Sequence, residues 1–91
     1  MQPVNLPIDG TLDLHTFKPE DLPDLLTDYF AACIENNIYS LRIVHGKGKG
    51  ILKKRVHDLL KKHEMVASFR SAPLEAGGWG ATLVELKRRD P

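Results

Sequence analysis

Apolar residues recur along this chain at two different spacings, and the order of those spacings limits the fold more than any other feature of the sequence. Alternation of apolar and polar residues predicts strands, whereas recurrence at every third and fourth position predicts helices with one buried stripe. The strand pattern occupies residues 11–15, 40–45, 66–70 and 81–87, and the helix pattern occupies residues 19–37 and 51–63. The predicted order of elements is therefore β-α-β-α-β-β.

Two helices are too few to cover both faces of a four-stranded sheet. We therefore predict an α/β two-layer sandwich, in which a four-stranded mixed sheet carries both helices on one face. The first two strands are joined by a helix and should lie parallel through a right-handed crossover. The other face of the sheet stays open, and period two places Asp13 and His15 on it while Leu12 and Leu14 face the core.

The helical stripes supply the rest of the predicted core. The first stripe comprises Leu22, Leu25, Leu26, Tyr29, Phe30, Cys33 and Ile34, and the second comprises Leu52, Val56, Leu59, Leu60 and His63. Proline disrupts a helix interior, so Pro23 must lie in the first turn of the first helix.

Positive charge is concentrated in the middle of the chain. Residues 1–41 carry a net charge of −6, residues 42–62 carry +7 and residues 63–91 carry zero, which gives the formal net charge of +1. A basic segment around a glycine loop indicates an anionic partner, although a solvated basic helix face would produce the same charge.

Length and composition indicate one domain. We expect residues 1–10 to form an N-terminal extension and residues 11–91 to form the domain. Cys33 is the single cysteine, which excludes an intrachain disulfide and favours a reducing compartment. The sequence has no apolar run of the ~18 to 20 residues that span a membrane, and its start does not resemble a signal peptide. We therefore expect a cytoplasmic monomer with no membrane partner.

The sequence HGKGKG at residues 45–50 lies between a predicted strand and a predicted helix. Glycines at 46, 48 and 50 allow positive φ and close approach to a ligand, the following helix directs free N–H groups into the loop, and Lys47 and Lys49 add positive charge. The spacing matches neither a Walker A loop nor a dinucleotide-binding loop. It is suited to binding phosphate, although a tight strand-to-helix turn also needs glycines.

Three motifs occur in a particular order: LDLH at residues 12–15, HGKGKG at residues 45–50 and GGWGATLVEL at residues 77–86. In this order and spacing the chain resembles the Smr (small MutS-related) domain family, in its stand-alone, single-domain form, over residues 11–87. The resemblance implies a β-α-β-α-β-β sandwich that acts as a nuclease or nucleic-acid-binding module. It also implies functional roles for Asp13 and His15, for His45, Gly46, Gly48 and Gly50, and for Gly77, Gly78 and Gly80. Family members often have glycine after LDLH, where this chain has Thr16, whose hydroxyl would cap a turn or contact a phosphate.

The side chains favour RNA over DNA as substrate. Two imidazoles can share acid and base roles, so His15 or His45 would deprotonate the 2′-hydroxyl while the other protonates the leaving oxygen, with Asp13 orienting His15. DNA lacks that hydroxyl and would require an activated water, usually bound to Mg²⁺ or Mn²⁺. Asp13 is the only acid near the proposed site, so we predict no metal site and no required cofactor for RNA cleavage.

Other residues extend the predicted site. Arg42 should lie beside the face that carries Asp13 and His15, and Lys53, Lys54, Arg55 and Arg70 would continue a phosphate track. Trp79 is a stacking platform for a base or a lid over the core. The helical pattern already accounts for His57 and His63.

Alternative functions remain open on these residues. They are a DNA-nicking endonuclease, a non-catalytic module that binds nucleic acid, including RNA on a ribosome or DNA in a repair complex, and an enzyme for a small phosphorylated metabolite.

Overall fold

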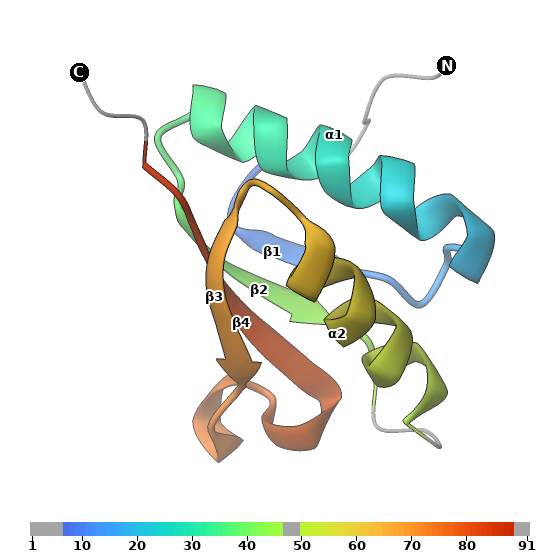
Figure 1. Ribbon diagram of the computed structural model, residues 1–91. Coiled ribbons are helices and arrows are strands. Elements are labelled where there is room, and N and C mark those ends of the chain that lie inside the picture. Colours follow the sequence, from blue (N-terminus) through green and yellow to red (C-terminus); the bar gives the residue numbers. More distant parts are fainter. Residues whose placement is uncertain (1–6, 47–49, 89–91) are drawn as a thin grey trace.

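The computed structural model describes residues 7–46 and 50–88, which form a two-layer α/β sandwich (Figure 1). The strands are β1 (Thr11–Asp13), β2 (Ser40–Val44), β3 (Val66–Ser71) and β4 (Ala81–Leu86), and the helices are α1 (Leu22–Glu35) and α2 (Ile51–Lys62). Single turns of 3-10 helix occur at η1 (Pro19–Asp21), η2 (Leu74–Ala76) and η3 (Gly78–Gly80). The predicted order of strands and helices is confirmed.

The sheet has the strand order β1-β2-β4-β3. Strands β1 and β2 are parallel, and β4 runs antiparallel to both of its neighbours, β2 and β3. As a consequence β1, β2 and β3 all end, and β4 begins, at one edge of the sheet, which we call the rim. All three sequence motifs therefore meet the rim, because LDLH spans the end of β1, HGKGKG follows β2 and the GGWG of the third motif precedes β4.

Both helices cover the same face of the sheet, as predicted (Figure 1). The sheet contributes alternate residues to one core, and the helices contribute their predicted stripes. The buried apolar residues of this core are Leu12, Leu14, Leu41, Ile43, Val84 and Leu86 from the sheet side, Leu22, Leu25, Leu26, Tyr29, Phe30 and Cys33 from α1, and Val56 and Leu60 from α2. Among the described residues no α-helix covers the opposite face of the sheet, which we call the open face.

The first strand is two residues shorter than the predicted range 11–15. An Asp13 carboxylate oxygen accepts the backbone N–H of His15 at 3.0 Å, and this local bond turns the chain away from the sheet. The turn is closed by a bond from the N–H of Phe17 to the carbonyl of Leu14 at 3.0 Å, so that His15 and Thr16 occupy its exposed centre. The strand pattern was correct up to Asp13, and the side chain of Asp13 itself ends the strand.

Helix α1 begins and ends where local chemistry requires. Pro23 lies in its first turn, where a missing N–H costs no intrahelical bond. The chain leaves the helix through Asn37 at φ 60°, a conformation that asparagine tolerates better than most residues.

Among the described residues, no helix is both long enough and apolar enough to cross a bilayer.

Candidate nucleic-acid-cleaving site

Asp13 and His15 form a side-chain pair at the rim. The Nδ1 of His15 lies 2.8 Å from Oδ1 of Asp13, and the same oxygen accepts the backbone N–H of His15. Because a carboxylate only accepts hydrogen bonds, Nδ1 of His15 carries a proton. In the neutral ring this leaves Nε2 with a free lone pair, which is the arrangement that a general base needs.

The pair is accessible to a substrate. The side chains of His15 and Asp13 are 75% and 53% exposed. The two hydrogen bonds from His15, first the backbone one and then the imidazole one, lower the pKa of Asp13. The carboxylate therefore stays ionised at neutral pH and keeps orienting the imidazole.

His45, the second predicted catalytic histidine, lies in a different environment. It is only 6% exposed, and both of its ring nitrogens have partners within the protein. The Nδ1 atom lies 3.2 Å from the carbonyl oxygen of Gly46, so Nδ1 must donate, and Nε2 lies 2.8 Å from the hydroxyl of Thr82. His45 thus binds the first residue of the glycine loop through its own side chain.

The hydroxyl of Thr82 bridges two imidazoles. Its oxygen lies 2.8 Å from Nε2 of His45 and 2.8 Å from Nε2 of His57 in α2. Since Nδ1 of His45 is the protonated nitrogen, its Nε2 accepts the Thr82 O–H, and the Thr82 oxygen accepts N–H from His57. All three hydrogen bonds are therefore donated in one direction, from His57 to Thr82, from Thr82 to His45 and from His45 to Gly46. We call these four residues the imidazole chain.

Burial keeps the imidazole chain uncharged. Burial is the largest factor that lowers the pKa of His45, and the nearby Lys53 lowers it further, against the opposing effect of the Gly46 carbonyl. The pKa of His57 is also lowered, first by burial and then by Lys53 and His45. Both rings are consequently neutral at pH 7, as the assigned pattern of donors and acceptors requires.

The two predicted catalytic histidines lie on opposite sides of the sheet. Asp13 alternates with the buried Leu12 and therefore faces the open side, and its carboxylate holds His15 there. His45 contacts His57 of α2 at a ring separation of 6.2 Å and therefore lies on the helix side. The structure brings Asp13 and His15 together, and it separates His45 from them.

The third motif is fastened to the rim by backbone bonds that continue the β2–β4 pairing and by one side chain on the open face. The backbone N–H groups of His45 and Gly46 both donate to the carbonyl of Gly80 at 2.9 Å. On the open face, Arg42 donates from Nη1 to the carbonyl of Ala76 at 3.1 Å. Alternation along β2 correctly predicted the face of Arg42, although this guanidinium also serves a structural role.

Glycine is required at two points of these motifs. Gly77 has φ +114°, and a β-carbon there would approach the β-carbon of Ala81 to 2.9 Å. Gly46 has φ +84°, and apart from its chain neighbours no atom of the described residues lies within 4 Å of such a carbon, so the described structure restricts it only through its backbone conformation. Gly50, at φ 80°, is the N-cap of α2 and has no side chain with which to cap that helix end. Lys47, Gly48 and Lys49 lie outside the described residues.

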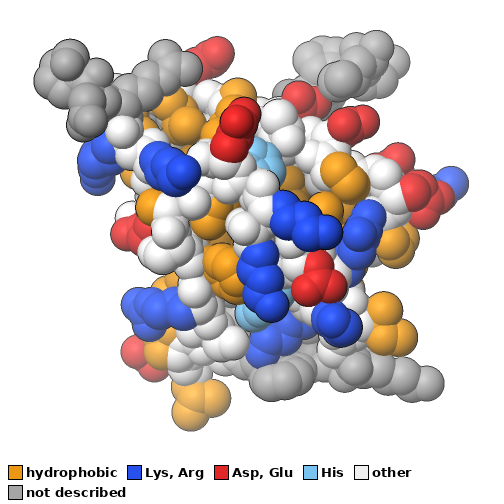
Figure 2. All heavy atoms as spheres, in the orientation of Figure 1, with side chains coloured by type: hydrophobic (Ala, Val, Ile, Leu, Met, Phe, Trp, Pro, Cys, Tyr) orange, Lys and Arg blue, Asp and Glu red, His pale blue; other side chains and the backbone are white. Residues whose placement is uncertain are grey.

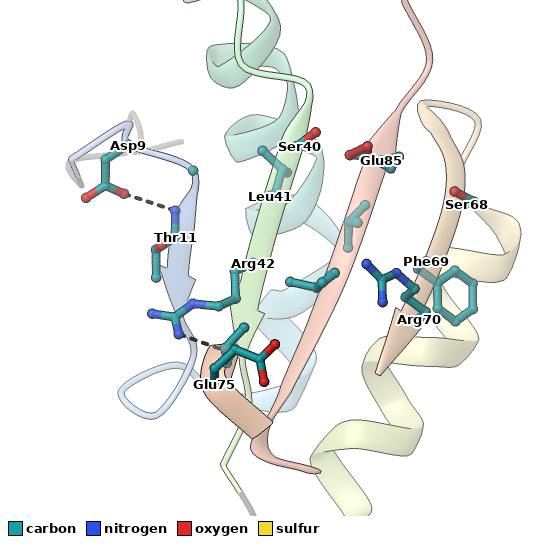
Figure 3. Close-up of a pocket in the computed structure, with 14 residues that line it drawn as sticks. Asp9, Thr11, Ser40, Leu41, Arg42, Ser68, Phe69, Arg70, Glu75 and Glu85 are labelled. Carbon is teal, nitrogen blue, oxygen red and sulfur yellow. Dashed lines mark hydrogen bonds between the residues drawn. The ribbon is translucent and has the colours of Figure 1, made fainter. Parts of the chain in front are cut away.

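The remaining predicted residues are distributed over several surfaces. Lys53 is buried, with 8% exposure, whereas Lys54 and Arg55 are exposed on α2. Figure 2 shows several Lys and Arg side chains over α2. Gly78 is buried within the third motif beside Trp79, whose side chain lies outside the described part of the structure. Arg70 projects from β3 on the open face (Figure 3).

Sequence reasoning missed Thr82 and His57. The signal was present for Thr82, because period two places it with Val84 and Leu86 on the core face of β4, where a hydroxyl needs a partner. His57 lies on the same helical stripe as Val56 and Leu60, and its bond to Thr82 shows that packing alone does not account for it.

Within residues 7–46 and 50–88, no three His, Cys, Asp or Glu side chains are grouped as a metal ion would require.

These features match a known family. The family model for the Smr domain covers residues 12–87. The chain belongs to the Smr domain family. The crystal structure of the Smr domain of Thermus thermophilus MutS2 has the same fold, with a TM-score of 0.78 and 28% identity over 85% of this chain and 96% of that one.

Full-length relatives are larger than this chain. Endonuclease MutS2 of Staphylococcus carnosus is 42% identical over 76 residues, which are 84% of this chain and 10% of the relative. Ribosome rescue factor SmrB of Aliivibrio fischeri is 42% identical over 82 residues, which are 90% of this chain and 46% of the relative. This chain therefore spans less than half the length of these two relatives.

Proposed function

We propose that this Smr domain is an endonuclease that cleaves single-stranded RNA, with His15 as the general base. The observation that carries the proposal is the exposed Asp13–His15 pair, in which a carboxylate fixes the imidazole and Nε2 has no partner among the described residues. The relative named as an endonuclease supports nucleic-acid cleavage. The relative named as a ribosome rescue factor supports RNA as the substrate. The second relative also makes RNA on a ribosome a reasonable natural substrate.

In the proposed reaction, Nε2 of His15 removes the proton of a 2′-hydroxyl, and the oxygen attacks the adjacent phosphorus. The bond from phosphorus to the 5′ oxygen breaks, and that oxygen takes up a proton from the imidazolium or from water. Asp13 stabilises the imidazolium that forms, because its carboxylate is ionised and already bonded to Nδ1. The hydroxyl of RNA supplies the nucleophile, so no metal-bound water is needed.

We propose for His45 a different task from the one the sequence indicated, and its burial supports this. With both ring nitrogens engaged and 6% exposure, His45 has no free atom for proton transfer to a substrate. We assign to it the positioning of Gly46 and thereby of the glycine loop. The loop amides, together with the charges that the sequence places at Lys47 and Lys49, would stabilise the phosphate, and Lys54 and Arg55 would hold flanking phosphates.

The test compares cleavage with binding in Asp13→Asn and His15→Ala. Both residues are exposed and outside the apolar core, so the variants should fold, as circular dichroism would verify. Loss of a positioned acid-base group should slow cleavage by about 10² to 10⁴. Binding to a 2′-O-methyl RNA, which has no free 2′-hydroxyl, should change far less.

Cleavage is measured both with chelator and with Mg²⁺ or Mn²⁺, on RNA and on DNA. Asp24→Asn, which neutralises an exposed acid in the first turn of α1, is the matched control and should leave the rate unchanged. If the His15→Ala variant cuts RNA at the wild-type rate, the base is elsewhere. If the wild type binds but cuts nothing under any condition, the domain is a binding module. Cutting of DNA alone would make it a DNA-nicking enzyme.

A further inference from the structure

The open face carries a groove with a volume of about 760 Å³, a size typical of ligand sites (Figure 3). Its floor comes from all four strands, and part of η2 lies beside it. The lining residues include charged side chains of both signs, several hydroxyls and the apolar Leu83. Asp13, His15 and the residues of the imidazole chain do not line this groove.

The strand register orders the floor into two rows across the sheet. The first row runs Thr11, Arg42, Leu83 and Arg70, and the second runs Ser40, Glu85 and Ser68. Arg42 and Arg70 therefore stand on either side of Leu83, each one strand away from it, about 5 Å between neighbouring strands. Figure 3 shows the two arginines on either side of β4.

The charges around the groove are not paired with one another. Among the described residues the ion pairs are His15 with Asp13 and Lys54 with Asp58, and neither pair lines the groove. Arg70 and Glu85 consequently keep their hydrogen-bonding groups available to a ligand. Two arginines meet three acids there, Asp9, Glu75 and Glu85, so the groove is slightly negative and poorly suited to a phosphate track.

The groove is continuous with the proposed catalytic pair. Thr11 lines it, and Asp13 lies two residues further along the same face of β1, roughly 7 Å away. An RNA strand that has a phosphate at His15 can therefore place a neighbouring nucleotide over the groove.

We propose that the groove is a subsite for an unpaired base next to the scissile phosphate, an inference that rests on the proposed function. Bases are neutral and planar, they stack on guanidinium planes such as that of Arg70, and their amino and imino groups donate to carboxylates such as that of Glu85. The mixture of donors and acceptors matches a base edge, and the net charge disfavours the sugar-phosphate backbone. The phosphates pass over the rim towards the glycine loop and α2.

The experiment measures the affinity of two ligands by fluorescence anisotropy. One is a short single-stranded 2′-O-methyl RNA, and the other has the same backbone and charge but abasic units in place of its central nucleotides. The wild type should bind the base-bearing ligand roughly 3- to 30-fold more tightly, the range expected when a base contacts a guanidinium. Arg70→Gln should remove most of that preference and leave the affinity for the abasic ligand unchanged.

Two further variants separate base recognition from charge. Arg70→Lys keeps the charge but loses the planar group, so it should behave like Arg70→Gln. Arg55→Gln, on exposed α2, should weaken binding of both ligands equally, since it removes a phosphate contact.

Each other outcome overturns the inference. Arg70→Lys binding like wild type, or Arg70→Gln weakening both ligands equally, would mean that Arg70 contacts phosphate. Equal binding of the two ligands by the wild type would leave the proposed nuclease intact but the groove without a base. Failure of the wild type to bind either ligand would refute the nuclease function and the subsite together.

Discussion

Replacing Thr82 by valine tests the imidazole chain directly. Thr82 is fully buried, and its hydroxyl is the shared partner of His45 and His57, at 2.8 Å from each. Valine has nearly the same shape, so the change leaves the packing of β4 in place and removes only the two hydrogen bonds. The substitution therefore isolates the contribution of the hydroxyl to the free energy of unfolding.

The expected cost follows from what remains after the hydroxyl is removed. The Nε2 of His45, at 6% exposure, would be left without a partner and out of reach of water, which costs about 1 to 3 kcal/mol. The Nε2–H of His57 is less deeply buried and can reach water more readily, so its loss adds about 0.5 to 1 kcal/mol. We expect Thr82→Val to lower the free energy of unfolding by about 1.5 to 4 kcal/mol.

Urea unfolding followed by circular dichroism measures this difference through the midpoint at constant slope. Thr82→Ser keeps the hydroxyl and should recover most of the loss, less the packing of one methyl group. Thr27→Val is the matched control, because the hydroxyl of Thr27 bonds Nε2 of His63 at 3.0 Å in an exposed position, and it should cost less than about 1 kcal/mol. Equal costs for Thr82→Val and Thr27→Val would refute the buried chain.

Two further results are expected. The pKa values of His45 and His57 are lowered in the folded protein, so below pH ~6.5 the unfolded chain binds more protons than the folded one. The free energy of unfolding should therefore be nearly constant between pH ~7 and ~8 and fall as the pH is lowered towards 5; urea midpoints that stay flat from pH ~7 down to 5 would contradict this expectation. Gly77→Ala should destabilise the fold by more than Gly46→Ala, because both variants incur the ~1 to 2 kcal/mol cost of a positive φ but only the β-carbon at position 77 also approaches Ala81 to 2.9 Å. Equal thermal midpoints for the two variants would show that the third motif shifts to accommodate the added carbon.

Most of the fold could be predicted because local pattern and global packing agree. The stripe that includes Leu26 and Phe30 required a helix, the alternation at Leu41 and Ile43 required a strand, and two helices sufficed for only one face. The end of β1 could not be predicted from periodicity. The bond from Asp13 to the backbone of His15 competes with the sheet, and an apolar-polar pattern contains no information about that competition.

The site was predicted less completely, because residue type alone does not say which side of the sheet a histidine faces at a strand end. His45 follows the alternation of β2 to the helix side, whereas the turn after Asp13 keeps His15 on the open side. Lys53 shows the same limit: its charge suggested an exposed track, and its helical position makes it buried. The open-face groove depends on residues from four strands and has no local signature.

The opposite placement of His15 and His45 bears on the organisation of the rim. The backbone of His45 and Gly46 holds Gly80 in line with the β2–β4 pairing, and Arg42 holds Ala76 from the open face, so the third motif is fixed at two points. Such contacts place their ligand-facing groups without requiring the ligand. His15, in contrast, lies in an exposed turn and is oriented by a single carboxylate, Asp13. The rim thus combines a fixed frame, which supports the start of the glycine loop, with the exposed imidazole of His15, whose Nε2 has no partner among the described residues.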